Sequence, residues 1–175
     1  MHSFLSRLNA LFTFLSSVLA AATALVFIQT LFLNYTVPID VKVENVKLKP
    51  IRDVTGKSDI ATAGFHLHAD LTPIFNWNVR LAYVWLQAEY ATEERPINQL
   101  IIWDTYLKRF EDTVLNRKIA KPPISNQFVD YGNNLRGRNV TFTLHWTVVP
   151  NAGWLRNVLD QEGSTSVRLP LEYNW

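Results

Sequence analysis

The chain has 175 residues, of which 48% are hydrophobic, 13% aromatic and only 18% charged. This composition excludes a disordered tail, a coiled coil and a collagen-like rod. The 17 Lys and Arg against 15 Asp and Glu leave a net charge of +2, too balanced for binding nucleic acid through phosphate contacts. The absence of cysteine excludes disulfide scaffolds, cysteine-ligated metals and thiol nucleophiles. We therefore expect one domain that is stabilised by its own core.

The N-terminal region contains a long apolar segment. Residues 10–33 include no charge, Pro or Gly, and as a helix they would extend about 36 Å at roughly 1.5 Å per residue, against about 30 Å for a hydrocarbon core. The sequence thus predicts one transmembrane signal anchor, preceded by a short segment over residues 1–9. The alternative is a signal peptide cleaved after Ala22-Thr23-Ala24. Against it, the apolar stretch continues from Leu25 to Leu33, where a cleavable signal would turn polar.

The flanking charges predict the orientation of this anchor. Arg7 lies on the N-terminal side with no acidic residue, whereas the first charge beyond the helix is Asp40. By the positive-inside rule, residues 1–9 are cytosolic and residues 34–175 face an ER-derived lumen or the exterior, as in a single-pass type II protein. Two N-glycosylation sequons, at Asn34 and Asn139, favour this topology. We expect the glycan at Asn139, because Asn34 directly follows the apolar segment.

Residues 34–175 show the alternation that is typical of β-strands. Strands are expected within residues 39–48, 65–71, 79–90, 100–103, 140–148 and 167–169. In the clearest of these, the apolar side chains are Val140, Phe142, Leu144, Trp146 and Val148, interleaved with Thr and His. Residues 104–118 mix apolar and charged residues and are expected to form an irregular crossover or a short helix. About six strands without a βαβ rhythm predict an all-β fold, an antiparallel β-sandwich.

No motif for catalysis or cofactor binding reaches a specific pattern. His66, His68 and Asp70 share one face of a strand at a spacing that a metal site could use, but they are more simply the polar face of the sheet. Ser125, Ser164 and Ser166 lie outside any G-x-S-x-G elbow. The glycines at 132 and 137 have a P-loop-like spacing without the Lys-Ser/Thr pair. We therefore expect no catalytic residue, no metal and no cofactor.

Several segments of the chain form a recognisable set. They are Phe75-Asn76-Trp77-Asn78-Val79, Ala88-Glu89-Tyr90, Asn98-Gln99, Trp103-Asp104 and the block over residues 139–153, N-V-T-F-T-L-x-W-x-V-V-P-N-A-G. In this order they resemble a known family, the glycosylated accessory subunit, subunit 3, of the eukaryotic signal peptidase complex. The resemblance implies a non-catalytic subunit in the ER membrane. Its lumenal β-sandwich would pack against a separate catalytic subunit that carries Ser, His and Asp. It also implies a glycan at Asn139 and a role in removing signal peptides from nascent secretory proteins.

Two other functions remain open from the residues alone. One is a type II membrane glycoprotein with a ligand-binding β-sandwich ectodomain, although only residues 34–38 separate the membrane from the first strand. The other is a small lumenal metalloenzyme that would use His66 and His68 as ligands. The residues also leave open whether Ser16, Ala20 and Ala24, which are spaced four apart, form a helix-packing stripe in the membrane.

Overall fold

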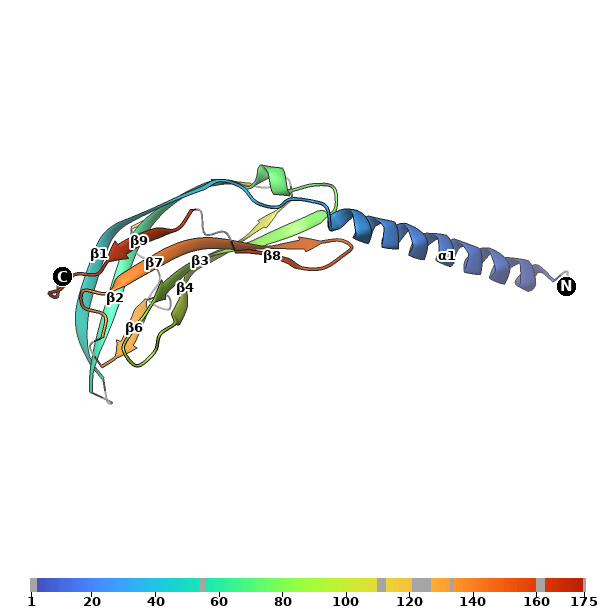
Figure 1. The fold of residues 1–175 in the computed structure, drawn as a ribbon. Coiled ribbons are helices and arrows are strands. Elements are labelled where there is room, and N and C mark those ends of the chain that lie inside the picture. Colours follow the sequence, from blue (N-terminus) through green and yellow to red (C-terminus); the bar gives the residue numbers. More distant parts are fainter. Residues whose placement is uncertain are drawn as a thin grey trace.

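The computed structural model describes residues 3–53, 56–109, 113–120, 127–132, 134–159 and 163–174. One long N-terminal helix projects from one end of an elongated β-domain, and the C-terminus lies at the opposite end (Figure 1). Helix α1 spans Phe4–Thr30, and the side chain of Ser3 caps it by accepting a hydrogen bond from the backbone N–H of Ser6. Within the described part of the chain, α1 is the one helix long and apolar enough to cross a membrane.

Four strands form the first sheet, which we call sheet A. The long hairpin of β1 (Ile39–Asp53) and β2 (Gly56–Asp70) is antiparallel over its whole length. Strands β5 (Val114–Ile119) and β6 (Phe128–Tyr131) follow each other along the second edge of β2, which makes β2 the central strand. A short 3-10 helix, η1 (Thr72–Ile74), connects sheet A to the second sheet.

Five strands form the second sheet, sheet B, in the order β4-β3-β7-β8 with β9 also beside β7. Its strands are β3 (Val79–Tyr90), β4 (Asn98–Lys108), β7 (Asn139–Pro150), β8 (Arg156–Leu159) and β9 (Thr165–Arg168), and all pairs are antiparallel. Strands β8 and β9 share the outer edge of β7, with β8 near its end and β9 near its start. The expected all-β fold of two antiparallel sheets behind one helix is confirmed.

The two sheets pack face to face around an apolar core, as the alternation in the sequence predicts. The five alternating apolar side chains of β7, from Val140 to Val148, are buried, and Trp146 is completely buried. Ring contacts join the sheets from Phe65 in β2 to Trp103 in β4, and from Phe128 in β6 to Phe142 in β7. Dispersion and the removal of this apolar surface from water stabilise the sandwich.

The prediction of an irregular crossover or a short helix over residues 104–118 is wrong. Strand β4 continues through Lys108, and residues 114–119 form β5. The register of β4 against β3 shifts between Leu86 and Gln87, which leaves Ile102 as the extra residue of a bulge. A bulge reverses which side chains face the core, so the buried residues Ile102 and Leu107 are an odd number apart. Because the alternation of apolar and polar residues changes phase at the bulge, a search for regular alternation misses the second half of β4.

The ends of the domain are defined by the register of its long strands. Val79 pairs with Pro150 beside α1, whereas Tyr90 pairs with Val140 at the far end. Twelve residues of β7 extend about 40 Å at roughly 3.3 Å per residue. We call the two regions the helix-proximal end and the distal end. The helix ends at Thr30, so residues 31–33 of the expected apolar segment form a turn of 3-10-type hydrogen bonds after it.

Candidate functional site

The connection between α1 and the sandwich is built into the core. Tyr35 and Val37 follow the helix and are buried, although Asn34 and Thr36 between and beside them are exposed. The indole Nε1–H of buried Trp146 donates to the backbone carbonyl of Tyr35 over 3.0 Å. A buried hydrogen bond of this kind fixes the position of the connecting chain. The helix is thereby joined to the sandwich without a flexible stalk.

A second contact at the helix-proximal end is a clamp formed by Asn78. This side chain is only 1% exposed, and it donates to the Ala152 carbonyl at 2.7 Å and accepts from the Ala152 N–H at 3.1 Å. The backbone carbonyl of Asn78 also accepts from the Asn151 N–H at 2.7 Å. The side-chain amide thus pairs with a peptide group as a neighbouring strand would. The loop between β7 and β8 is consequently held against the segment that precedes β3.

The outward face of sheet B carries an outer aromatic cluster of Tyr83, Trp85, Tyr106 and His145. Tyr83 lies between Trp85 and Tyr106, with ring centroids 5.5 Å and 5.1 Å away, and Trp85 covers His145 at 5.7 Å. Tyr106 is 67% exposed. Partial burial raises the pKa of Tyr83 above its ordinary value, and the Asp104 carboxylate that accepts its hydroxyl hydrogen bond acts in the same direction. Exposed aromatic surface of this kind is typical of protein interfaces.

The histidine face that the sequence analysis considered lies on the outward face of β2. His66 is half-buried with its Nε2 3.0 Å from the Asn116 side-chain oxygen, and His68 is exposed. The Asp70 carboxylate accepts hydrogen bonds from the side chain and the backbone N–H of Thr72. These hydrogen bonds lower the pKa of the Asp70 carboxyl. Within the described ranges, no group of three or more His, Asp and Glu side chains could hold a metal ion. The arrangement is that of a polar sheet face.

The serine and histidine residues that were considered for catalysis lie at different places in sheet B. Ser164 and Ser166 are exposed in and before β9, at the edge of sheet B beside the start of β7. His145, one of the residues interleaved with the apolar positions of β7, is buried under Trp85. Ser125 lies outside the described residues. The two described candidate serines, Ser164 and Ser166, are therefore surface residues at a sheet edge.

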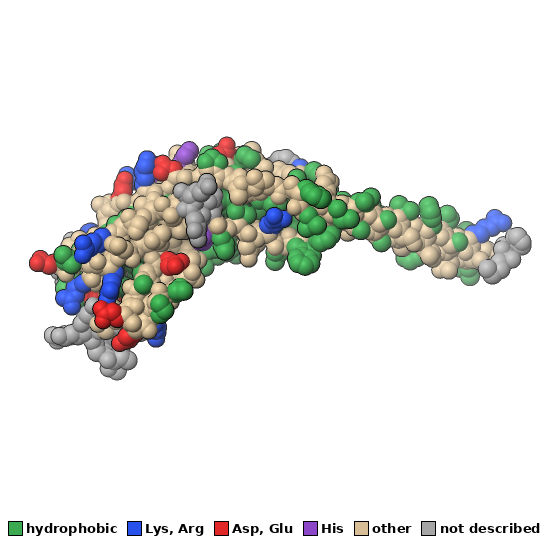
Figure 2. Space-filling model, viewed as in Figure 1, with side chains coloured by type: hydrophobic (Ala, Val, Ile, Leu, Met, Phe, Trp, Pro, Cys, Tyr) green, Lys and Arg blue, Asp and Glu red, His purple; other side chains and the backbone are tan. Residues whose placement is uncertain are grey.

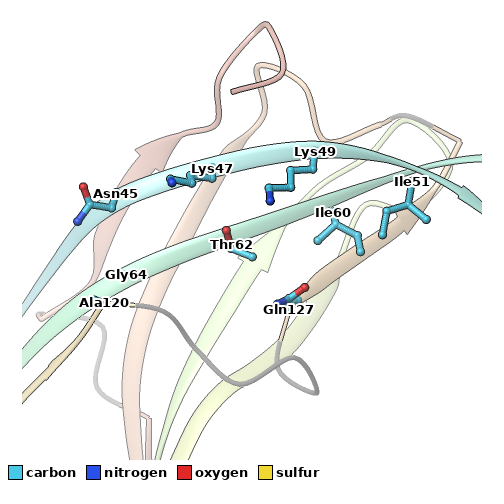
Figure 3. Close-up of a pocket in the computed structure, with 9 residues that line it drawn as sticks. All are labelled: Asn45, Lys47, Lys49, Ile51, Ile60, Thr62, Gly64, Ala120 and Gln127. Atoms are coloured by element: carbon cyan, nitrogen blue, oxygen red, sulfur yellow. The ribbon is translucent and has the colours of Figure 1, made fainter. Parts of the chain in front are cut away.

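A groove lies on the outward face of sheet A and has a cavity volume of about 480 Å³. Figure 3 shows side chains from β1 and β2 along it, among them Lys47, Lys49 and Thr62. Asn45 adopts a left-handed conformation, φ 53°, at the bulge of β1 that shapes one end of the groove. The described residues that line it supply cationic, amide, hydroxyl and aliphatic groups. The groove thus offers a mixed polar and apolar binding surface.

A pair of carboxyl groups lies inside the distal end. Asp59 is completely buried, and it accepts from the Tyr173 hydroxyl at 2.9 Å and from the Leu135 N–H at 3.3 Å. Asp130 faces Asp59 across the β2–β6 pairing. Burial raises the pKa of the Asp130 carboxyl above its ordinary value, and the charge of Asp59 adds to this effect. Because Asp59 joins the C-terminal segment to two other segments, its contacts are those of a structural residue.

The two sequon asparagines lie at opposite ends of the domain. Asn139 is exposed as the first residue of β7 at the distal end, directly after a turn in which Gly137 has φ 65°. Asn34 is exposed four residues after the helix ends, and its side-chain oxygen accepts from the N–H and hydroxyl of Thr36. Asn139 therefore lies about 40 Å, the length of β7, from the helix-proximal end.

Sequence reasoning did not find the Asn78 clamp or the outer aromatic cluster. The clamp joins residues 74 positions apart, so no local pattern contains it. The cluster lies on the outward parity of β3, where Tyr83 and Trp85 made that strand look apolar on both faces. The signal for the cluster was present, because outward aromatic residues in a strand indicate a covered or interacting face.

Taken together, these features define a class: a β-sandwich held rigidly to one apolar N-terminal helix, with exposed surfaces that suit interaction with other molecules. A family model described as "Signal peptidase subunit" matches residues 1–172. Proteins named "Signal peptidase complex subunit 3" are similar to the chain over almost its whole length. The one from Gallus gallus is 43% identical, and the one from Homo sapiens is 42% identical, each covering 99% of this chain and 97% of its own. The one from Caenorhabditis elegans is 41% identical, covering 90% and 89%.

The chain belongs to the signal peptidase complex subunit 3 family. The expected family resemblance is therefore confirmed, as is the expected class of function, an accessory subunit of that complex.

Proposed function

We propose that this chain acts as a non-catalytic subunit of an ER signal peptidase complex, anchored by α1 with residues 34–175 in the lumen. The observation that carries the proposal is the match to named complex subunits over 99% of the chain. The rigid connection of α1 to the sandwich supports it, since a subunit that positions a partner needs a fixed geometry relative to its own anchor. The separate catalytic subunit is the expected partner.

Depletion and rescue test the non-catalytic role. Removing the protein should leave secretory precursors uncleaved, because the catalytic subunit loses its lumenal partner. Reintroducing the chain with His66→Ala, His68→Ala, Ser164→Ala or Ser166→Ala should restore cleavage nearly fully, measured per assembled complex. A loss of about a thousandfold or more from one such change, with the complex intact, would mean that the chain supplies a catalytic group.

Protease protection tests the proposed topology. Protease added outside sealed microsomes should remove at most a few N-terminal residues, because residues 34–175 would be enclosed. Digestion of the sandwich under these conditions, with a lumenal marker protected, would reverse the orientation.

The proposed glycan at Asn139 has its own test. Asn139→Gln should abolish an endoglycosidase-sensitive mobility shift, because the exposed distal asparagine is clear of the membrane surface. Asn34→Gln is the matched control and should leave the shift unchanged, since Asn34 follows closely on the helix. A shift that depends on Asn34 would contradict the proximity argument.

A further inference from the structure

The loop between β7 and β8 exposes large apolar side chains beside α1. Trp154 is 79% exposed and Leu155 is 65% exposed. Neighbouring apolar residues after the helix, Leu31 and Phe32, are exposed as well. Figure 2 shows hydrophobic side chains gathered where the helix meets the sandwich, continuous with those along the helix. Such surface on a lumenal domain is unfavourable in water and requires an apolar environment.

This loop contacts the helix itself. The Trp154 ring lies 6.1 Å from the ring of Phe27, three residues before the end of α1. A Cβ at Gly153 would lie 3.2 Å from the Thr30 hydroxyl and 3.7 Å from the Phe27 ring, so the loop backbone lies directly against the last turn. The tip of the hairpin accordingly lies beside the end of α1 in Figure 1.

The position of Phe27 along the helix indicates the depth of this contact. Twenty residue steps separate Arg7 from Phe27, which is about 30 Å at roughly 1.5 Å per residue, the thickness of a hydrocarbon core. With Arg7 at the cytosolic interface, Phe27 therefore lies at the lumenal one. A residue that packs on Phe27 from outside the helix is at the boundary between headgroups and acyl chains, where Trp is enriched.

The loop is held rigidly in this position. The Asn78 clamp binds both polar backbone groups of Ala152, two residues before Trp154. With its polar groups already paired, this part of the loop meets the requirement for backbone near a bilayer. Side chains fixed in place by the protein also lose little conformational entropy on binding.

Cationic side chains lie at the same end of sheet B as the β7–β8 loop. Arg156 opens β8 directly after Leu155, Arg80 lies in β3, and Arg109 directly follows β4. The Arg109 guanidinium donates to the Trp77 carbonyl at 3.0 Å, and Trp77 is itself half-exposed. An apolar loop with arginine at the same end of the sheet is the arrangement that suits acyl chains and phosphate groups at one interface.

We propose that the β7–β8 loop, through Trp154 and Leu155, inserts into the lumenal leaflet beside α1 and forms a second membrane contact. The ligand is the phospholipid interface rather than a partner chain. This inference rests on the proposed membrane anchor. With two contacts, the sandwich is fixed in tilt and rotation relative to the bilayer, which a single helix cannot do.

Fluorophore labelling tests the inference, because the chain has no native cysteine. Single cysteines replace Trp154 and, independently, Leu155 in the full-length chain, which is labelled with an environment-sensitive dye and reconstituted in phosphatidylcholine nanodiscs. Both labels should lose emission to a nitroxide near the head of the acyl chain. The matched control is Ile97→Cys, because Ile97 is 67% exposed but lies at the distal end, and its label should be unaffected.

A label inside α1 separates this inference from the proposed anchor. Ser17 lies ten residues from Arg7, about 15 Å and thus near the bilayer centre, so the Ser17→Cys label should lose emission mainly to a nitroxide deep in the acyl chain. Quenching at 17 without quenching at 154 and 155 would overturn the inference and leave the anchor intact. No quenching at 17 would overturn both.

Photo-crosslinking in microsomes tests whether lipid also covers the loop in the assembled complex. A photoreactive residue in place of Trp154 should form a lipid adduct. An adduct with another protein chain would show that a partner occupies this surface, and the inference would be wrong.

Discussion

At each end of the sandwich, an asparagine side chain donates to one backbone carbonyl and accepts from one backbone N–H, but the two asparagines differ in burial. At the helix-proximal end, the Asn78 side chain pairs with the N–H and carbonyl of Ala152. Near the distal end, Asn174 accepts from the Leu48 N–H at 2.8 Å and donates to the Val46 carbonyl at 3.1 Å, beside the bulge of β1. Asn78 is buried, whereas Asn174 is exposed.

This difference has an energetic meaning. Water can replace the partner of an exposed backbone group, but a buried group that loses its partner bears the full cost of desolvation. The helix-proximal end therefore depends on each of its polar contacts, and it is the end that must hold α1 and the β7–β8 loop in fixed positions. The distal end carries the exposed sequon, and the contacts that Asn174 makes there lie at the surface.

The largest expected effect is the loss of Trp146, whose ring fills the core and whose Nε1–H holds the carbonyl of Tyr35. Trp146→Ala should reduce the free energy of unfolding by about 3–5 kcal/mol, from lost apolar contact and the cavity that remains. Thermal unfolding of the full-length chain in detergent measures this. Thr143→Ala is the control, because Thr143 is half-buried on the opposite face of β7. Equal destabilisation by both changes would contradict the assignment of faces.

Removal of the Asn78 side chain gives the next largest effect, and its comparison with removal of the Asn174 side chain tests the difference between the two ends. Asn78→Ala should lower the free energy of unfolding by about 1–3 kcal/mol, because it removes both hydrogen bonds that the buried Asn78 amide makes to the backbone of half-buried Ala152. Asn174→Ala removes the same number of side-chain hydrogen bonds and should cost less, about 1 kcal/mol, because Asn174 is itself exposed and water can enter the place of its side chain, although Leu48 is buried. Chemical denaturation of both variants measures the difference. Equal losses would mean that burial does not distinguish the two ends.

The sequence predicted the parts of this structure that follow from local periodicity. The uncharged segment predicted α1, and the apolar positions of β7 predicted its buried face. Both patterns can be read from residues that are close together in the sequence. The bulge at Ile102 and the clamp at Asn78 depend on contacts between distant segments, so periodicity could not reveal them. Among site residues, Asn139 was available from its motif, whereas the exposure of Trp154 beside Phe27 required the fold.

The smallest expected effect concerns Asp130 at the distal end. Burial raises the pKa of its carboxyl above the ordinary value, so the folded state retains the proton to higher pH than the unfolded state. The contribution of this group to stability is therefore present below the ordinary pKa, about 3.9, and is lost as the pH rises through the raised value. At neutral pH the ionised carboxylate is unfavourable in the folded protein.

Asp130→Asn should consequently stabilise the chain at neutral pH, by less than about 1 kcal/mol because solvent reaches the half-buried carboxyl. The gain should shrink as the pH is lowered toward 4, where the wild-type group becomes protonated. Melting temperatures measured across this range give the trend. Asp40→Asn at the helix-proximal end is the control, because Asp40 is exposed beside Lys42 at 3.1 Å and should show no such gain. Destabilisation by Asp130→Asn at neutral pH would mean that the Asn134 hydrogen bond, which favours the carboxylate, outweighs the effect of burial.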